Sequence, residues 1–267
     1  MNLNKLFLTK NNCYKVGETI TVKGIMVHST GANNPWLKRY LPNDGKIGIN
    51  EYGNHWNTPT PDGKKVCVHG FIGKLADGTV ATYQTLPWNY RGWHAGGTAN
   101  NTHIGFEICE DCLNDVIYFN AVYKEAVELC AYLCKEFGLT EKNIICHSEG
   151  YKKGIASNHG DVMHWFPKHG KSMNTFRADV KTLLNKEDIK LEQLKKDVAQ
   201  LKNDVAEIKN KMIYAWVDDN MPEWAKPTIT KLVNKGYLKG DNEGKLNLDD
   251  NMLRILVIND RAGIYGK

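Results

Sequence analysis

The fold is decided around one stretch, Ile144-Ile145-Cys146-His147-Ser148-Glu149-Gly150, which is followed by Ala156-Ser157-Asn158-His159-Gly160-Asp161. Its apolar start predicts a short buried strand, and His147 stands at the end of that strand. His28 ends a second apolar run, Gly24-Ile25-Met26-Val27, far upstream. Because open α/β sheets place ligands at one edge, His28, His147 and Asp161 can converge there. Two imidazoles and a carboxylate that leave one position open for water are what a catalytic zinc site needs.

Each of these three residues also has an ordinary structural role open to it. A single histidine at a strand end is more often a hydrogen-bonded structural residue than a metal ligand. Asp161 taken alone is more often a helix cap. Only the conjunction of His28, His147 and Asp161 favours a metal site over these structural roles.

The first two thirds of the chain alternate short apolar runs with turns and helical segments. Strands are expected at 65–73, 80–85, 103–109 and 143–146, with a hairpin turn over 75–78 between the first two. Helical periodicity over 118–137 stops at Gly138, and a closing helix is expected over 175–184. This order predicts an α/β fold, with a mixed central sheet flanked by helices, as a domain over residues 1–184.

A heptad pattern follows the predicted first domain. Its apolar residues, spaced by three and four, are Leu191, Leu194, Val198, Leu201, Val205, Ile208 and Met212. The spacing predicts a helical linker over 185–213. The favoured interpretation is self-association into a homodimer through residues 191–212, because β-branched residues at the a position of the heptad favour a two-stranded coiled coil. The alternative is a monomeric amphipathic spacer that packs on a neighbouring domain.

Residues 214–267 form a third segment, in which helices are expected up to about Val233 and over 249–262. About fifty residues can build only a small core. We therefore expect a small C-terminal helical domain that serves targeting rather than catalysis.

Composition excludes several classes of function. The net charge of +5 is spread over the chain without a concentrated basic patch, so a nucleic-acid partner is not expected. No apolar run approaches the ~20 residues of a membrane span, so membrane insertion is not expected. The first residues lack a signal peptide, which predicts synthesis in the cytoplasm. Seven scattered cysteines predict reduced, mostly buried thiols.

Four motifs occur in a fixed order along the predicted first domain. They are Gly24-Ile25-Met26-Val27-His28-Ser29-Thr30-Gly31, Trp93-His94-Ala95-Gly96-Gly97, His103-Ile104-Gly105-Phe106-Glu107, and His147-Ser148-Glu149 through Asp161 and Trp165. Together they resemble the type 2 N-acetylmuramoyl-L-alanine amidases, zinc amidases related to peptidoglycan recognition proteins. The closer likeness is to endolysins of phages that infect Gram-positive, clostridial-type bacteria. The resemblance covers residues 3–183. It implies zinc-dependent hydrolysis of the amide bond between N-acetylmuramic acid and L-alanine in peptidoglycan, which lyses the bacterial cell.

The resemblance also implies roles for individual residues. The zinc ligands match His28, His147 and Asp161, and the general base matches Glu107. His159 occupies a position that is Lys in many relatives, where the side chain stabilises the oxyanion of the tetrahedral intermediate. An imidazole donates well to an oxyanion only when protonated, so activity is expected to fall off at lower pH than with Lys.

Trp93 and His94, in the second motif, are expected to line the substrate groove and bind the glycan or the peptide. For His94 the alternative is a structural role, in which its hydrogen bonds order the loop.

The C-terminal segment resembles one S-layer-homology-type repeat, which implies binding to a secondary wall polymer. Such modules often act as several repeats, and dimerisation through the linker would supply a second copy and raise avidity. The family's closing helix begins differently here, with Asp249-Asp250-Asn251-Met252-Leu253-Arg254. A lysin without a signal peptide is expected to reach the wall from the host cytoplasm after release by a holin.

Two other classes of function compete with the amidase. Recognition of peptidoglycan without catalysis would require a missing zinc ligand, and all three positions are filled. A zinc nucleobase deaminase is suggested by Cys109-Glu110-Asp111-Cys112, but neither the upstream His-x-Glu nor the preceding Pro is present. A redox or structural-metal role for this pair lacks a second pair of ligands at suitable spacing.

Overall fold

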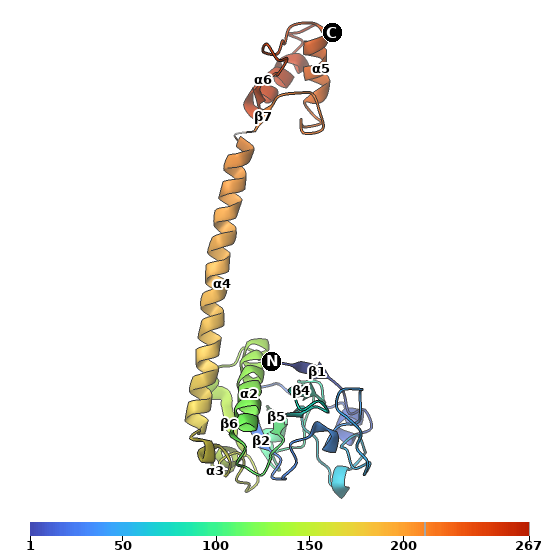
Figure 1. Ribbon diagram of the computed structural model, residues 1–267, viewed down its shortest axis with the longest axis vertical. Coiled ribbons are helices and arrows are strands. Elements are labelled where there is room, and N and C mark those ends of the chain that lie inside the picture. The colour runs from blue at the N-terminus through green and yellow to red at the C-terminus, as the bar shows by residue number, and fades with distance from the viewer. Residues whose placement is uncertain (211, 267) are drawn as a thin grey trace. The chain divides into compact units, whose positions relative to one another are not determined.

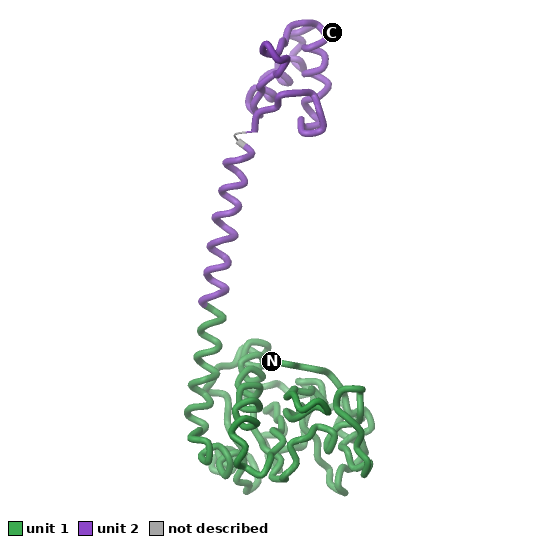
Figure 2. The backbone as a smooth tube through the Cα atoms, in the orientation of Figure 1, with its two compact units in different colours: residues 1–188 green, residues 189–267 purple. Residues whose placement is uncertain are grey.

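The computed structural model describes residues 1–210 and 212–266; Lys211 and Lys267, which fall within the predicted linker and C-terminal domain, lie outside the described residues. The chain divides into two compact units, residues 1–188 and 189–267 (Figure 2). One helix, α4 (Met173–Asn210), contributes residues to both units. The closing helix expected over 175–184 and the helix of the linker are therefore one continuous helix.

Unit 1 is built on a six-stranded mixed sheet, which confirms the predicted α/β class. The strand order is β1-β4-β3-β5-β2-β6, and only the β3–β4 pair is antiparallel. The strands are β1 (Leu3–Lys5), β2 (Gly24–Ser29), β3 (Gly70–Lys74), β4 (Val80–Gln84), β5 (His103–Ile108) and β6 (Ile144–Cys146). The hairpin turn expected over 75–78 joins β3 to β4 as predicted.

Helix α2 (Val116–Phe137) covers one face of the sheet (Figure 1). The Asp115 carboxylate caps its first turn by accepting hydrogen bonds from the backbone N–H groups of Ile117 and Tyr118. Gly138 ends the helix in the left-handed conformation, with φ at 64°. Successive strand residues point to opposite faces. Ile25 and Val27 therefore join the core under α2, while Met26 belongs to a separate cluster on the opposite face.

Short helices and loops surround the sheet. They are α1 (Asn12–Val16), η1 (Leu37–Arg39), η2 (Pro61–Gly63), η3 (Thr98–Asn101), η4 (Glu141–Asn143), α3 (His147–Lys152) and η5 (Phe166–His169). A second apolar cluster, which includes Leu41, Phe71 and Tyr83, packs the loops around η1 onto β3 and β4. The start of α4 closes the main core with Met173, Phe176 and Val180.

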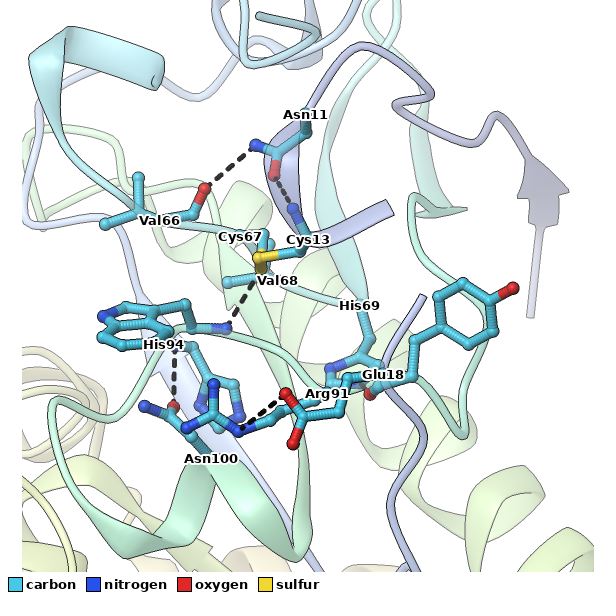
Figure 3. The surroundings of a disulfide bond; sticks show 12 residues. Asn11, Cys13, Glu18, Val66, Cys67, Val68, His69, Arg91, His94 and Asn100 are labelled. Atoms are coloured by element: carbon cyan, nitrogen blue, oxygen red, sulfur yellow. Dashed lines mark hydrogen bonds and ion pairs between the residues drawn. A yellow bond between two sulfur atoms is a disulfide. The ribbon is translucent and has the colours of Figure 1, made fainter. Parts of the chain in front are cut away.

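The expectation that all the cysteines are reduced is wrong for two of them. Cys13 in α1 and Cys67 are joined by a disulfide across 54 residues of sequence, with their Cα atoms 6.4 Å apart (Figure 3). Five cysteines are free, including both members of the Cys109–Cys112 pair. This disulfide could not be predicted from the sequence, because seven scattered cysteines do not reveal which pair lies within bonding distance.

Unit 2 has a small core of its own. Besides its part of α4 it holds β7 (Ile213–Tyr214), α5 (Lys226–Asn234), β8 (Leu248–Asp249) and α6 (Asp250–Arg261). The core consists of Tyr214, Met221, Ala225, Ile229, Leu248, Leu253 and Val257. Asp249 caps α6 by accepting a hydrogen bond from the Met252 backbone N–H at 2.7 Å. Within the described ranges, no helix combines the length and the apolar character needed to cross a membrane.

Candidate metal centre

The parallel strands β5, β2 and β6 bring three predicted site residues to one level of the sheet. His28 on β2 pairs in register with Glu107 on β5. Val27 pairs with Cys146 on β6, so His147, the first residue of α3, comes next to His28. The site therefore lies at the carboxyl ends of adjacent parallel strands, where open α/β sheets bind ligands.

Three side chains that could bind a metal face one another at this edge. His28 Nδ1 lies 3.1 Å from Asp161 Oδ2 and 3.1 Å from His147 Nδ1. The third side of the triangle, His147 Nδ1 to Asp161 Oδ2, measures 3.7 Å. Ligand atoms about 2.0–2.1 Å from a tetrahedral zinc ion would be about 3.3–3.4 Å apart. The structure thus brings the ligand atoms of His28, His147 and Asp161 into a triangle that could hold a metal ion.

Burial and mutual charge shape the electrostatics of this cluster. His28 and His147 are almost completely buried, and Asp161 is mostly buried. Burial lowers the pKa of His147 to about 4, helped by the neighbouring His28. Burial also acts to lower the pKa of His28, but the hydrogen bond that His28 donates to Asp161 and the charges of Glu107 and Asp161 outweigh it, and this pKa is raised. For Asp161, the hydrogen bond and charge of His28 overcome burial and lower the pKa.

Glu107 lines the same pocket as the three possible ligands, and one of its carboxyl oxygens lacks a hydrogen-bond partner among the described residues. Its Oε2 atom is buried and, among the described residues, has no hydrogen-bond partner. Burial raises the pKa of Glu107 to about 8, although the nearby His28 opposes the shift. A buried carboxyl oxygen left without a protein partner is suited to hold a water molecule or a substrate group.

His94 lies against His28, where a backbone carbonyl fixes its protonation. The carbonyl of His103 can only accept, so His94 Nε2, 3.1 Å away, carries the proton and donates. Burial, aided by the charge of His28, holds the pKa of His94 well below its usual range, so the ring is neutral. Its bare Nδ1 then accepts from His28 Nε2–H across 2.9 Å. The lone pair of a neutral His28 is thereby left on Nδ1, the atom that faces Asp161 and His147.

Gly105 makes this arrangement of histidines possible. Residue 105 lies two positions before Glu107 on β5 and so faces the same side of the sheet. A Cβ atom there would come within 2.3 Å of His94 Nδ1, closer than side chains tolerate. Any residue with a side chain at this position would push His94 away from His28.

Ser157 supports the other histidine of the cluster. Its Oγ atom lies 3.2 Å from His147 Nε2 and 3.2 Å from the Ala95 carbonyl oxygen. The hydroxyl donates to that carbonyl and can accept from His147 Nε2–H, which leaves the His147 lone pair on Nδ1. His159 Nδ1 lies 3.0 Å from the same oxygen, so Ser157 connects the cluster to the exposed His159.

The remaining predicted residues line the pocket around the cluster. The pocket has a volume of about 390 Å³, and its lining includes Trp93, His94, Glu107 and His159. The indole of Trp93 is 43% exposed, and the Arg91 guanidinium packs over it at 4.9 Å. Trp93 also lines a neighbouring pocket of about 300 Å³, whose lining includes Cys13 of the disulfide. Its backbone N–H contacts Cys67 Sγ at 3.0 Å, so the disulfide and the pocket wall are in contact.

The structure brings His28, Glu107, His147 and Asp161 together, as the sequence predicts, and adds Ser157, which the sequence analysis missed. A serine in a polar loop carries no sequence signal of its own. Its contact with His147 depends on how the loop between them folds back on α3.

Comparison with known proteins places most of unit 1 in one family. A family model described as N-acetylmuramoyl-L-alanine amidase matches residues 18–164, more than half of the chain. The match includes His28, Glu107, His147 and Asp161. No curated protein sequence matches the chain.

Solved structures are similar to part of the chain. The Staphylococcus aureus hydrolase AmiA, solved in complex with its ligand, is 18% identical with a TM-score of 0.51, over 69% of this chain and 83% of that one. A mutant endolysin from Bacillus subtilis is 23% identical with a TM-score of 0.46, over 67% of this chain and 99% of that one. At 18% identity the likeness to AmiA concerns the fold alone.

Proposed function

Because this chain belongs to the N-acetylmuramoyl-L-alanine amidase family and is an amidase that acts on peptidoglycan, we propose that its reaction depends on Zn²⁺ held by His28, His147 and Asp161. The bond cut is the amide between N-acetylmuramic acid and L-alanine. The observation that carries the proposal is the triangle of two Nδ1 atoms and one carboxylate oxygen, because its size and donor set suit tetrahedral zinc. Bound Zn²⁺ would supply Lewis-acid polarisation and lower the pKa of water at the site.

Glu107 is proposed as the general base and then the general acid. It takes a proton from the water whose oxygen attacks the amide carbonyl carbon, and it delivers that proton to the leaving nitrogen as the C–N bond breaks. Its Oε2 atom is buried without a protein partner, and burial brings its pKa to about 8, within range of neutral pH. A cation at the neighbouring ligand set favours the carboxylate form that this role requires.

His159 and Trp93 are proposed to contact the substrate. His159 is exposed beside His147, with ring centroids 4.6 Å apart, so it can donate to the oxyanion that develops on the carbonyl. Trp93 offers an exposed ring face to the sugar or the peptide from the pocket wall.

His94 and Ser157 are proposed to position the two ligand histidines. Each fixes the tautomer of its partner through a hydrogen bond to the ring nitrogen that faces away from the cluster. Such partners hold the ring and direct its other nitrogen toward the metal. This role replaces direct substrate binding as the main role of His94, whose two ring nitrogens both contact protein.

Unit 2 is proposed to bind the cell wall, with a secondary wall polymer as its ligand. The core of this unit is small, yet its aromatic residues Trp216, Trp224 and Tyr237 are exposed and available to contact a ligand. Removing residues 189–267 should weaken sedimentation with purified walls while unit 1 keeps its hydrolytic activity on soluble fragments. Unchanged sedimentation would end the proposal for unit 2.

We further propose that the chain is a phage lysin and that residues 191–212 of the linker self-associate. Expressed in the cytoplasm of a clostridial-type host, the enzyme should lyse cells only when the membrane is permeabilised from inside. Lysis without permeabilisation would contradict the need for a holin.

Mass analysis of digested peptidoglycan tests the reaction itself. The enzyme should release intact stem peptides with a free L-alanine amino terminus and leave the glycan strands uncut. Chelation should stop the release and added Zn²⁺ should restore it. Glu107→Gln serves as the matched control, because it should keep the metal and lose turnover by roughly 10²–10⁴-fold. New reducing ends would show that a glycan bond is cut instead.

A further inference from the structure

The second half of α4 carries an uncovered apolar stripe along one side. Its six large side chains in the described helix are each between 43% and 64% exposed: Leu191, Leu194, Val198, Leu201, Val205 and Ile208. Residues spaced by three and four fall on one face of a helix. Monomeric proteins rarely expose such a continuous stripe, so another surface is expected to cover it.

We infer that this stripe pairs with the same stripe of a second copy in a parallel, in-register, two-stranded coiled coil. The inference rests on the self-association proposed above and adds the identity of the partner and its direction. In heptad terms Val198 and Val205 occupy a positions, while Leu194 and Leu201 occupy d positions. Valine at a with leucine at d favours two strands.

The charges that flank the stripe decide the direction. Lys195, Lys202 and Lys209 follow the d residues at e positions, and Asp197 and Asp204 precede the a residues at g positions. In a parallel pair, each g residue meets the e residue five positions later on the partner. Asp197 then faces Lys202 of the partner subunit, and Asp204 faces Lys209 of the partner subunit. The two-fold symmetry makes each of these opposite-charge contacts twice.

An antiparallel pair would place like charges together. There, e positions face e positions and g positions face g positions, so lysines would line one side and aspartates the other. The parallel pair has one like-charge contact, between Lys190 and Lys195 of the partner subunit, at the start of the coil. Charge complementarity therefore favours the parallel direction.

Hydrogen bonds within the helix hold the two aspartates at the edge of the stripe. The side-chain amide of Gln193 donates to Asp197 at 2.8 Å, and that of Gln200 donates to Asp204 at 2.8 Å. Both donors are neutral, so each carboxylate keeps its charge for a lysine of the partner subunit. Lys195 is the e residue with an ion pair inside its own helix, to Glu192 at 2.7 Å.

A parallel pair has a consequence for the proposed wall binding. Both copies of unit 2 would follow the same end of the coil, so two modules could engage one polymer. Linked binding of this kind raises avidity without any new contact. Three heptads form a weak coil on their own, so the association should depend on protein concentration.

Single cysteines in the full chain distinguish the arrangements. In a background with Cys112→Ser, which removes the exposed free thiol, four variants are compared under mild oxidation: Leu201→Cys, Leu194→Cys, Val205→Cys and Lys196→Cys. Leu194 and Leu201 occupy d positions, and each meets its own copy only in a parallel pair. An antiparallel pair places a residues opposite d residues, so Leu194 would meet Val205 of the partner subunit, and a mixture of Leu194→Cys and Val205→Cys chains tests that direction. Lys196 points outward and is the matched control.

The expected result is rapid cross-linking of both Leu201→Cys and Leu194→Cys, at least tenfold faster than Lys196→Cys. Cross-linking between Leu194→Cys and Val205→Cys chains, without cross-linking of either variant to itself, would overturn the parallel direction and leave self-association standing. Rates no higher than that of Lys196→Cys in all of these samples would overturn self-association itself. The peptide-release assay on the same variants should be unaffected, so the proposed reaction is judged separately.

Reversing the charges tests the reason given for the direction. Lys202→Asp with Lys209→Asp should weaken dimerisation by roughly tenfold or more, because aspartate would then face aspartate. Asp197→Lys with Asp204→Lys should do the same, and a mixture of the two double variants should regain the dimer in sedimentation equilibrium. Dimerisation that neither double variant weakens would contradict the charge argument.

Discussion

The metal centre and the exposed half of α4 are built in opposite ways. The centre gathers His28, His147 and Asp161 from two distant parts of the sequence and buries them, so each side chain has a unique set of neighbours. The apolar stripe of α4 repeats one simple spacing and stays exposed. In the centre, the positions of the individual ligand atoms decide whether a metal can bind. Along the helix, the repeated spacing of apolar residues produces the exposed stripe.

This contrast predicts that single substitutions act very differently in the two regions. A change in the buried centre should alter a unique contact that no other residue can replace. A change on the helix should remove one of several equivalent contacts and leave the fold of unit 1 untouched.

The largest effect is expected from removing a ligand. His147→Ala should lower the zinc content below half of that in the parent chain and reduce peptide release by more than about 10³-fold, because two ligands cannot hold the ion in place. Metal content by mass spectrometry and the release assay are the measurements. His55→Ala, away from the pocket, is the control and should change neither. Full zinc content with full activity would remove His147 from the ligand set.

A smaller effect is expected at His94. His94→Leu should weaken zinc binding by roughly 10–100-fold, as is common when the partner of a ligand histidine is lost. His94→Gln should recover part of the affinity, because its amide can accept from His28 and donate to the His103 carbonyl. Competition with a zinc chelator measures both. Equal affinities for the parent and the leucine variant would show that His94 does not position His28.

The pH dependence of stability probes the buried histidines next to the centre. Burial lowers the pKa of His69 to about 4, and its ring bonds the Tyr90 carbonyl oxygen at 2.7 Å and the Gly105 N–H at 3.0 Å. A folded pKa below the usual value near 6.5 means that the stabilisation is complete above pH 6.5 and is lost as the pH falls toward 4. The slope from one such group is at most roughly 1.4 kcal/mol per pH unit.

Urea unfolding of the metal-free protein at pH 7 and pH 5 isolates this contribution when the parent is compared with His69→Gln. The comparison is needed because Glu107, with its pKa raised to about 8, has the opposite sign and loses its contribution as the pH rises. His69→Gln should show the smaller loss between pH 7 and pH 5. Equal losses in the two proteins would assign the acid sensitivity to other groups.

The smallest effect on unit 1 is expected from the helix. Leu201→Asp should abolish dimerisation yet change the free energy of unfolding of unit 1 by less than about 0.5 kcal/mol, as for other exposed positions. Urea unfolding followed by the tryptophans of unit 1, read beside sedimentation equilibrium, measures both. A large loss of stability in unit 1 would show that the stripe packs on that unit, as in the alternative of a monomeric spacer.

Much of the fold could be predicted from local patterns. The apolar runs that end in His28 and Glu107, the hairpin turn at 75–78 and the end of α2 at Gly138 all follow from the sequence, because each depends on neighbours within a few residues. The boundary expected after residue 184 does not interrupt α4, since nothing between the buried start of the helix and its heptads breaks it.

The site could be predicted only in part. The donor types and the ends of the strands indicated His28, His147 and Asp161. The contacts of His94, the role of Ser157 and the Cys13–Cys67 bond could not be read from the chain, because each joins residues brought together by other elements.

By itself, the sequence determined most of the longer strands and helices, which residues could bind a metal, and the heptad stripe with its flanking charges. These are local properties, fixed by side-chain chemistry and by periodicities of two and 3.6 residues. The tertiary structure alone decided which nitrogen of His28 faces the cluster. The His103 carbonyl accepts a hydrogen bond from His94, and His94 in turn accepts one from His28 Nε2–H. The arrangement requires glycine at position 105, because a Cβ atom there would clash with His94. Its physical reason is the fixed position of a backbone acceptor, which only the folded sheet provides.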